Sequence, residues 1–177
     1  MTTEPAPQPL TPAEERTWRT LMRLMMLLPR ALDEDLSRRT ALGLTRYVVL
    51  MRLSEAPEYT LRMSDLAEAV SISPSRMTRI VQSMVSEGLV TRRAAPSDGR
   101  ASLATLTEKG LHKLQEAWPA HLAGTRRLAM DHIEPRDLAS FNRMTEQLLR
   151  AVEDSVGFSQ GKPWSTGKAG DAEPGAA

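Results

Sequence analysis

The fold of this chain is decided by residues 73–110, which read SPSRMTRIVQSMVSEGLVTRRAAPSDGRASLATLTEKG. Ser73 is a natural N-cap, because its side-chain oxygen can accept a free N–H group of the first turn, and Pro74 suits the first helical position. Apolar residues then recur at helical spacing and predict one buried stripe, made of Met77, Ile80, Val81, Met84 and Val85. Gly88 can adopt the left-handed conformation that ends a helix. The pattern therefore predicts a capped amphipathic helix that stops at Gly88.

A β-hairpin is predicted directly after this helix. Its strands lie near residues 89–93 and 102–106, and the segment between them, 94–101, is rich in turn-forming residues. Asp98 stands two residues before Arg100 at the exposed tip, and a carboxylate there can hold the guanidinium in one pose through a bidentate pair. The alternative is a solvated turn in which the ion pair contributes very little.

The segment before the capped helix completes a helix-turn-helix. Residues 63–70 predict a short helix whose Leu66, Ala67 and Val70 face inward, and Ser71 and Ile72 form the turn. In such a motif the second helix inserts its N-terminal side chains into the major groove of DNA, and arginine there can pair bidentately with guanine. A narrow minor groove attracts an arginine delivered by the hairpin. The candidate DNA-binding residues are Ser73, Ser75, Arg76, Thr78, Arg79, Gln82, Arg92, Arg93, Asp98 and Arg100.

Positive charge is concentrated in the same stretch. Residues 73–100 contain five arginines and two acidic residues, a net charge of +3, whereas the whole chain carries only +1. The alternative explanation is that arginines such as Arg76 and Arg79 only solubilise a helix whose other face is core. The adjoining basic hairpin favours DNA binding over that explanation.

These motifs together resemble those of the MarR family of winged-helix transcription regulators. The resemblance spans about residues 14–155 and is carried by Leu44-Thr45, Leu66-Ala67, Met77-Thr78-Arg79, Gly88-Leu89-Val90 with Arg92-Arg93, Asp98-Gly99-Arg100, and Leu106-Thr107-Glu108-Lys109-Gly110. It implies a homodimer, an α-helical dimerisation region built from both ends of the chain, and often a small-molecule pocket between that region and the winged helix.

The expected fold is mainly α with a small β-hairpin wing: a dimeric winged helix-turn-helix with a helical dimerisation region. A long helix begins at Pro12 and is interrupted by Pro29, a second spans 44–56, a third runs from Thr107 towards Ile133, and the last begins at Pro135. The domains expected are a disordered N-terminus (1–11), a dimerisation helix (12–42), the winged helix-turn-helix DNA-binding domain (43–107), C-terminal dimerisation helices (108–156) and a disordered tail (157–177). Apolar stripes on the first and last helices favour burial against a second copy.

A ligand site is suggested by residues on helices that the family arranges around its pocket. They are Met22, Met25, Met26, Arg30, Tyr47, Met51, Trp118 and His121. Methionine suits a permissive apolar cavity, although a methionine stripe at helical spacing is more often plain core. Arg30 or His121 can pair with an acidic or phenolic ligand, or can instead cap a helix or face solvent.

Composition excludes several other classes of protein. The chain has no cysteine, so it can form neither a disulfide framework nor a thiol redox sensor. No two of His112, His121 and His132 can share one zinc ion, and no cofactor is expected. No nucleophile–base pair, metal cluster or phosphate loop indicates an enzyme. Without a signal peptide or a run of about 18 apolar residues, a cytoplasmic protein with no membrane partner is expected.

The sequence thus predicts a regulator that binds double-stranded DNA specifically, as a homodimer on a palindromic operator, and is released by a small phenolic or aromatic effector. The alternative is a winged-helix module used for protein–protein interaction without DNA binding. That alternative would leave Arg76, Arg79 and Arg100 without a role.

Overall fold

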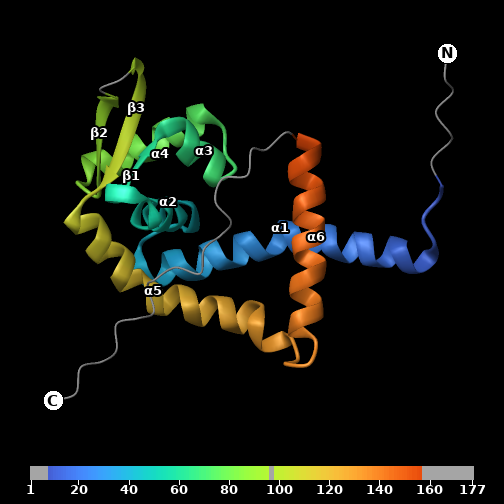
Figure 1. Cartoon of the computed structure of the whole chain (residues 1–177). Coiled ribbons are helices and arrows are strands. Elements are labelled where there is room, and N and C mark those ends of the chain that lie inside the picture. Colours follow the sequence, from blue (N-terminus) through green and yellow to red (C-terminus); the bar gives the residue numbers. More distant parts are fainter. Residues whose placement is uncertain (1–7, 96–97, 157–177) are drawn as a thin grey trace, which may run out of the picture.

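The computed structural model describes residues 8–95 and 98–156, and of residues 98–100 it describes the backbone alone. The elements in chain order are α1 (Pro12–Thr40), α2 (Leu44–Glu55), the 3-10 turn η1 (Pro57–Tyr59), β1 (Thr60–Arg62), α3 (Met63–Ala69), α4 (Pro74–Ser86), β2 (Val90–Ala95), β3 (Asp98–Leu106), α5 (Glu108–Leu128), the 3-10 turn η2 (Met130–His132) and α6 (Leu138–Val156). Figure 1 shows a winged helix mounted on a stem of long helices. The predicted mainly α fold with a β wing is confirmed.

The capped helix of the helix-turn-helix forms as predicted. The Ser73 hydroxyl accepts a hydrogen bond from the Arg76 N–H group at 3.4 Å, and Gly88 follows the helix with a φ of +73°. Three residues of the predicted stripe are fully buried: Met77, Val81 and Met84. The prediction for Val85 was wrong, because its side chain is 39% exposed. Val85 lies at the edge of the stripe, and the face of α4 that the core buries is narrower than the sequence pattern suggests.

The sheet contains a strand that the sequence pattern did not reveal. Its order is β1-β3-β2, and both pairs are antiparallel. The sequence predicted only a hairpin, because the three residues of β1 are too few to show the period of two that marks a strand. The hydroxyls of Thr60 in β1 and Thr105 in β3 lie 2.8 Å apart and join the two strands. Strand β3 begins at Asp98 rather than near Ser102, so the hairpin extends further than expected.

The start of α5 is locked onto the turn that follows α4. The Thr107 hydroxyl accepts the Gly110 N–H group at 3.0 Å and donates to the carbonyl oxygen of Gly88 at 2.8 Å, with the carbonyl oxygen of Leu89 also within reach at 3.0 Å. The Thr107 N–H group donates to the Leu89 carbonyl at 3.2 Å. A Cβ atom on Gly110 would stand only 2.1 Å from this carbonyl oxygen, so only glycine allows the approach. We call residues 87–89 and 107–110 the corner clamp.

A buried carboxylate joins the two long helices of the stem. Asp35 on α1 is only 4% exposed, and its Oδ1 atom lies 3.2 Å from Arg39 Nε and 2.8 Å from a guanidinium nitrogen of Arg127 on α5. Burial alone would raise the pKa of Asp35, but hydrogen bonds from these two arginines hold the pKa below its ordinary value. Gly124 makes the approach possible, because a Cβ atom there would lie 3.0 Å from the Asp35 Oδ2 atom.

Several helix ends differ from the predictions. Helix α1 contains Pro29 and runs on as one element to Thr40, and α5 likewise contains Pro119. Helix α5 ends at Leu128, not near Ile133, because Ala129 leaves the helical region with φ −140° and ψ −65°. Helix α6 begins at Leu138 and not at Pro135, since residues 135–137 form a turn. Disorder was predicted for residues 1–11 and 157–177; residues 8–11 are described as coil in which Thr11 caps α1, and the rest lies outside the described residues.

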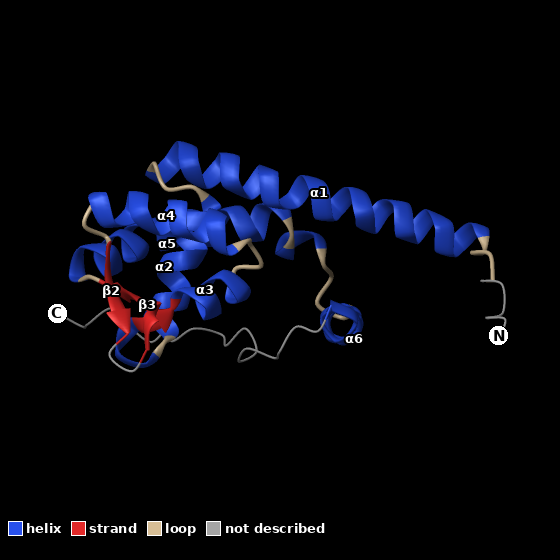
Figure 2. Ribbon diagram, turned by 90° about the horizontal axis from the view of Figure 1, so that it is seen from above, coloured by secondary structure: helices blue, strands red, loops and turns tan. Residues whose placement is uncertain are grey.

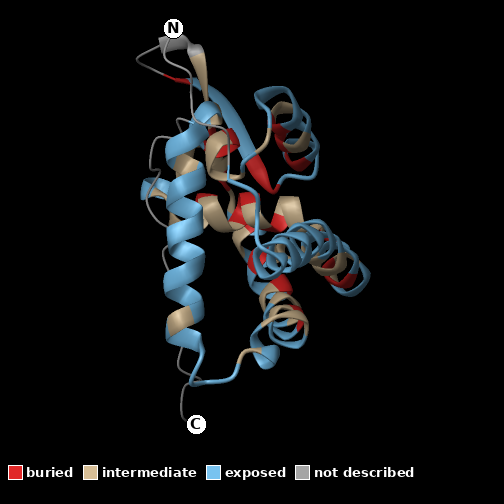
Figure 3. Ribbon diagram, turned by 90° about the vertical axis from the view of Figure 1, so that its right-hand side faces the viewer, coloured by how far each residue is buried: buried red, intermediate tan, exposed pale blue. Residues whose placement is uncertain are grey.

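Helix α6 stands apart from the body of its own chain. Figure 2 shows it end-on beside the stem, Figure 3 shows it exposed along nearly its whole length, and it packs extensively against no other described element. Its exposed apolar side chains are Leu138, Phe141, Met144, Leu148, Leu149, Val152 and Val156. Helix α1 likewise exposes Trp18, Met22, Leu24, Met25, Met26 and Leu27. Nothing in the described part of the chain covers these two stripes, and contiguous apolar surface of this kind is rare on monomers.

The corner clamp leads to the first testable prediction. Gly110→Ala should destabilise the protein by about 3 kcal/mol or more, because the new methyl group meets backbone and not a flexible side chain. Gln115→Ala, on the exposed side of the same helix, should change stability by less than about 0.5 kcal/mol. Urea unfolding at one fixed protein concentration measures both effects. Equal urea midpoints for the two variants would show that the corner clamp can shift to accept a methyl group and would contradict the prediction.

Candidate nucleic-acid interface

The exposed surface of α4 carries most of the side chains predicted to contact DNA. Ser73, Ser75, Arg76, Arg79 and Gln82 are all exposed, and they lie in the first turns of the helix or just before it. Thr78 differs, because its side chain is half-buried and its hydroxyl donates to the Pro74 carbonyl at 2.9 Å.

The two arginines of this surface are available for contacts outside the chain. Neither Arg76 nor Arg79 forms an ion pair with a carboxylate among the described residues, although many other arginines of the chain do. Their charges are therefore uncompensated at the N-terminal end of a helix, where the backbone N–H groups and the helix dipole also favour an anionic partner.

The sheet places the two wing arginines on opposite faces. Arg92 pairs with Ala104 and Arg93 with Leu103 across β2 and β3, and directly paired residues point to the same face of a sheet. Arg92 donates to the Ser102 hydroxyl at 3.1 Å, whereas Arg93 is exposed on the face opposite the buried Ala104. The predicted pairing of the Asp98 and Arg100 side chains lies outside the described residues.

Sequence analysis missed Arg62 as a possible contact because it missed strand β1. Arg62 pairs with Leu103, which in turn pairs with Arg93, so the three residues form one row across the sheet. Arg62 and Arg93 are both exposed on the same face, about 10 Å apart from strand to strand. The only signal in the sequence was a basic residue immediately before a short helix, which indicated nothing more than a poor N-cap.

The predicted ligand residues separate into two groups. Tyr47 is fully buried, its ring stacks on that of His121 with centroids 4.3 Å apart, and Trp118 lies 6.2 Å from His121. With the half-buried Met51 these residues meet where α2 packs against α5. Burial lowers the pKa of His121, which favours a neutral imidazole at pH 7. Burial and the Glu55 carboxylate raise the pKa of Tyr47, whose hydroxyl has no hydrogen-bond partner among the described residues.

The second group does not join the first within one chain. Met22, Met25 and Met26 are exposed on α1, and Arg30 is an exposed partner of Glu34 at 2.8 Å. The sequence could not distinguish the two groups, because all of these residues belong to apolar helical stripes or their edges.

Within residues 8–95 and 98–156, no three metal-ligating side chains lie close enough together to hold a metal ion. Within the same residues, no helix combines the length and the apolar character that a membrane crossing requires.

Comparisons with known proteins agree with this architecture. The MarR family profile matches residues 42–102. Sco3205, a MarR family transcriptional regulator from Streptomyces coelicolor solved in complex with DNA, is 30% identical, with a TM-score of 0.77 over 84% of this chain and 92% of that chain. AbsC, a MarR family transcriptional regulator from the same organism, is 32% identical, with a TM-score of 0.75 over 84% of this chain and 99% of that chain.

Curated relatives match over a shorter stretch. The uncharacterised HTH-type transcriptional regulator YdgJ of Bacillus subtilis is 32% identical over 78 residues, which are 44% of this chain and 46% of the relative. The chain thus spans about half the length of the curated relatives that it matches. The two Streptomyces structures, by contrast, are covered almost completely, and their TM-scores show the same overall fold. The chain belongs to the MarR family of transcriptional regulators.

Proposed function

We propose that the protein is a transcriptional regulator that binds double-stranded DNA sequence-specifically, as a homodimer on a palindromic operator. The observation that carries the proposal is the pair of exposed, uncompensated arginines, Arg76 and Arg79, at the N-terminal end of a capped helix beside a basic wing. The DNA complex of Sco3205, a structure of similar fold, supports it.

Within this interface the side chains divide into those that recognise bases and those that position the protein. Arg76, in the first turn of α4, is suited to the guanine edge in the major groove, and Arg79 is the alternate reader. Hydroxyls and the sheet arginines are suited to phosphate oxygens, which fix orientation without reading sequence. These positioning residues are Ser73, Ser75, Thr78, Arg92, Arg93 and Arg62, and the side-chain amide of Gln82 can bind phosphate in the same way. Arg100, held by Asp98, enters the minor groove at the tip of the wing.

Dimerisation follows from the uncovered stripes of α1 and α6. A second copy, related by a two-fold axis, would cover both stripes with the same surfaces of its own helices. Two recognition helices related in this way reach successive major grooves about 34–36 Å apart, so the half-sites form an imperfect palindrome.

An effector site lies between the stem and the winged helix, around Tyr47 and His121. The unpaired Tyr47 hydroxyl and the neutral imidazole of His121 suit a phenolic or aromatic ligand, which could stack and exchange hydrogen bonds. Met22, Met25 and Met26 are exposed on α1 of one chain. They complete the site when the dimer forms and α1 of one protomer packs against the other protomer. A ligand that binds more tightly to the dimer when its two recognition helices are at a distance unsuited to DNA releases the operator by population shift.

The recognition helix is tested by comparing two arginine variants. Arg76→Ala should cost about 1–3 kcal/mol on the cognate site and reduce discrimination against other sequences. Arg93→Ala should weaken binding to all duplexes alike and lower the salt slope by about one unit, because a phosphate contact carries no sequence information. Titration of the purified protein with its own upstream DNA and a scrambled duplex, at two salt concentrations, measures both.

A uniform loss in Arg76→Ala would make that residue a phosphate contact and contradict its assignment. If the wild-type protein binds no duplex at either salt concentration, the winged helix serves protein–protein contact instead.

The dimer is tested on the exposed stripe of α6. Leu148→Asp should convert the protein to a monomer, because it places a charge in the apolar surface that a partner buries. Asn142→Asp introduces the same carboxylate at a polar position of the same helix and should leave the dimer intact. Sedimentation velocity reports the two masses. A wild-type monomer, or a dimer that survives Leu148→Asp, would refute this interface.

The wing is tested by a double-mutant cycle. Arg100→Ala should weaken DNA binding and lower the salt slope by about one unit. Asp98→Ala should also weaken binding, although it removes a negative charge next to DNA, because Asp98 acts by pre-setting the guanidinium. The two losses should be strongly non-additive in affinities measured at one salt concentration. Tighter binding by Asp98→Ala, or simple additivity, would leave Asp98 as an ordinary turn residue.

A further inference from the structure

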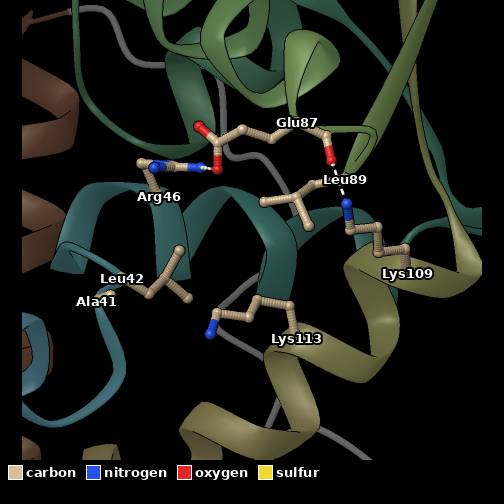
Figure 4. Close-up of a pocket in the computed structure, with 7 residues that line it drawn as sticks. All are labelled: Ala41, Leu42, Arg46, Glu87, Leu89, Lys109 and Lys113. Atoms are coloured by element: carbon tan, nitrogen blue, oxygen red, sulfur yellow. Dashed lines mark hydrogen bonds and ion pairs between the residues drawn. The ribbon is translucent and has the colours of Figure 1, made fainter.

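A cavity of about 320 Å³ lies next to the corner clamp, at the C-terminal end of the recognition helix α4. It is lined by Ala41, Leu42, Arg46, Glu87, Leu89, Lys109 and Lys113 (Figure 4). The lining comes from the α1–α2 turn, from α2, from the end of α4 and from the first turns of α5. None of the residues of the predicted effector site contributes to it. The cavity is therefore separate from the Tyr47 region.

Positive charge dominates the wall of this cavity. Arg46, Lys109 and Lys113 face a single carboxylate, that of Glu87, which leaves a net charge of +2. A hydrogen bond from Arg46 holds the pKa of Glu87 below its ordinary value, so this carboxylate is ionised at pH 7.

The three cations of the cavity wall are not fully used by hydrogen bonds and ion pairs within the chain. Arg46 is bound to Glu87 through one terminal nitrogen, while its buried Nε atom has no partner among the described residues. Lys109 donates to the main-chain carbonyl of Glu87 at 2.7 Å, a neutral acceptor. Among the described residues, the amino group of Lys113 pairs with Glu116 alone, at 3.7 Å, and Figure 4 shows it directed into the space beside Leu42.

The floor of the cavity is apolar. Leu42 is 1% exposed and Leu89 is 4% exposed, so both side chains are fixed by the core behind them. The cavity volume lies at the lower end of the range usual for small-molecule sites. A rigid apolar floor beneath unsatisfied cations suits a small anion that carries a compact organic group.

We propose that this cavity binds the phosphate group of a small metabolite, held by Lys113, Lys109 and Arg46, with its organic part lying on Leu42 and Leu89. A phosphate monoester carries about two negative charges at neutral pH, which matches the net charge of the wall. Lysine serves phosphate as a point charge, and the guanidinium fork of arginine can bind two phosphate oxygens.

A ligand in the cavity would affect how the recognition helix is held. Glu87 is the C-cap residue of α4, and a bound phosphate competes with it for Arg46 and Lys109. The ligand thereby loosens the attachment of α4 to α2 and α5 and weakens DNA binding, a step that rests on the proposed function. Linkage then requires DNA to weaken phosphate binding by the same factor.

Binding is tested without DNA, so that the result does not depend on the proposed function. Backbone amide NMR spectra of the full chain are recorded during titration with inorganic phosphate, phenyl phosphate and acetate, with ionic strength held constant by chloride. The expected shifts lie at residues 41–46, 87–89 and 109–113, with phenyl phosphate binding more tightly than inorganic phosphate because it also contacts the floor. Acetate should bind most weakly. No saturable shifts at these residues would overturn the proposal.

Lys113→Gln removes one cation from the wall, and because Lys113 makes no contact with Glu87 and only a 3.7 Å ion pair with the exposed Glu116, the variant should fold normally. It should weaken phosphate binding at least about fivefold, as the loss of a charge-assisted contact requires. Arg136→Gln removes an exposed cation that is paired with Glu134 in the α5–α6 connection, and it should leave binding unchanged. Equal losses in both variants would show only a non-specific charge effect and would overturn the site.

The coupling is tested separately by operator titration. At constant ionic strength, phenyl phosphate should weaken DNA binding by the wild-type protein more than by Lys113→Gln. Equal responses would refute the coupling while leaving the phosphate site intact.

Discussion

The close contact between the first turn of α5 and the Leu89 carbonyl is the constraint on which the rest of the structure depends. That one oxygen receives the Thr107 N–H group and lies within reach of the Thr107 hydroxyl, and the absence of a side chain at Gly110 permits the approach. The recognition helix ends and the wing begins on one side of this contact, and the stem begins on the other. The orientation of α4 relative to α5 is therefore set by backbone, which adjusts far less readily than side chains.

The opposite end of α5 is held by an ionic contact. Its 21 residues span about 30 Å, at 1.5 Å per residue, from the corner clamp to the Arg127–Asp35 pair on α1. Asp35 is nearly buried and also holds Arg39 of its own helix, so the contact with Arg127 is the ionic link that ties the end of α5 to α1. Helix α5 thus acts as a rod fixed at both ends, and the winged helix cannot turn freely on its stem.

Local patterns explain which parts of the fold could be predicted from the sequence. The cap at Ser73, the stripe of α4 and the positive φ of Gly88 are all determined within a few residues, and all three were confirmed except for Val85 at the margin of the stripe. Strand β1 was missed because its three residues are held by pairing to β3, forty residues away. The Asp35–Arg127 contact joins distant helices, and the phosphate cavity combines four separate elements, so no local pattern signalled either. The proposed DNA contacts rest on exposure and charge, which the sequence did indicate.

Rigidity within the protomer determines where control of DNA binding can act. Because the corner clamp fixes α4 to α5, the effector proposed near Tyr47 would not move the recognition helix of one chain alone. In the proposed dimer it would instead change how one stem meets the other. In that dimer a small rotation of the stems would be amplified at the recognition helices, since α5 spans the distance between the stem and the recognition helix. The cavity beside Glu87 offers the other route, because it acts on the clamp itself. One site would alter the distance between the two recognition helices, and the other would alter how firmly each is held.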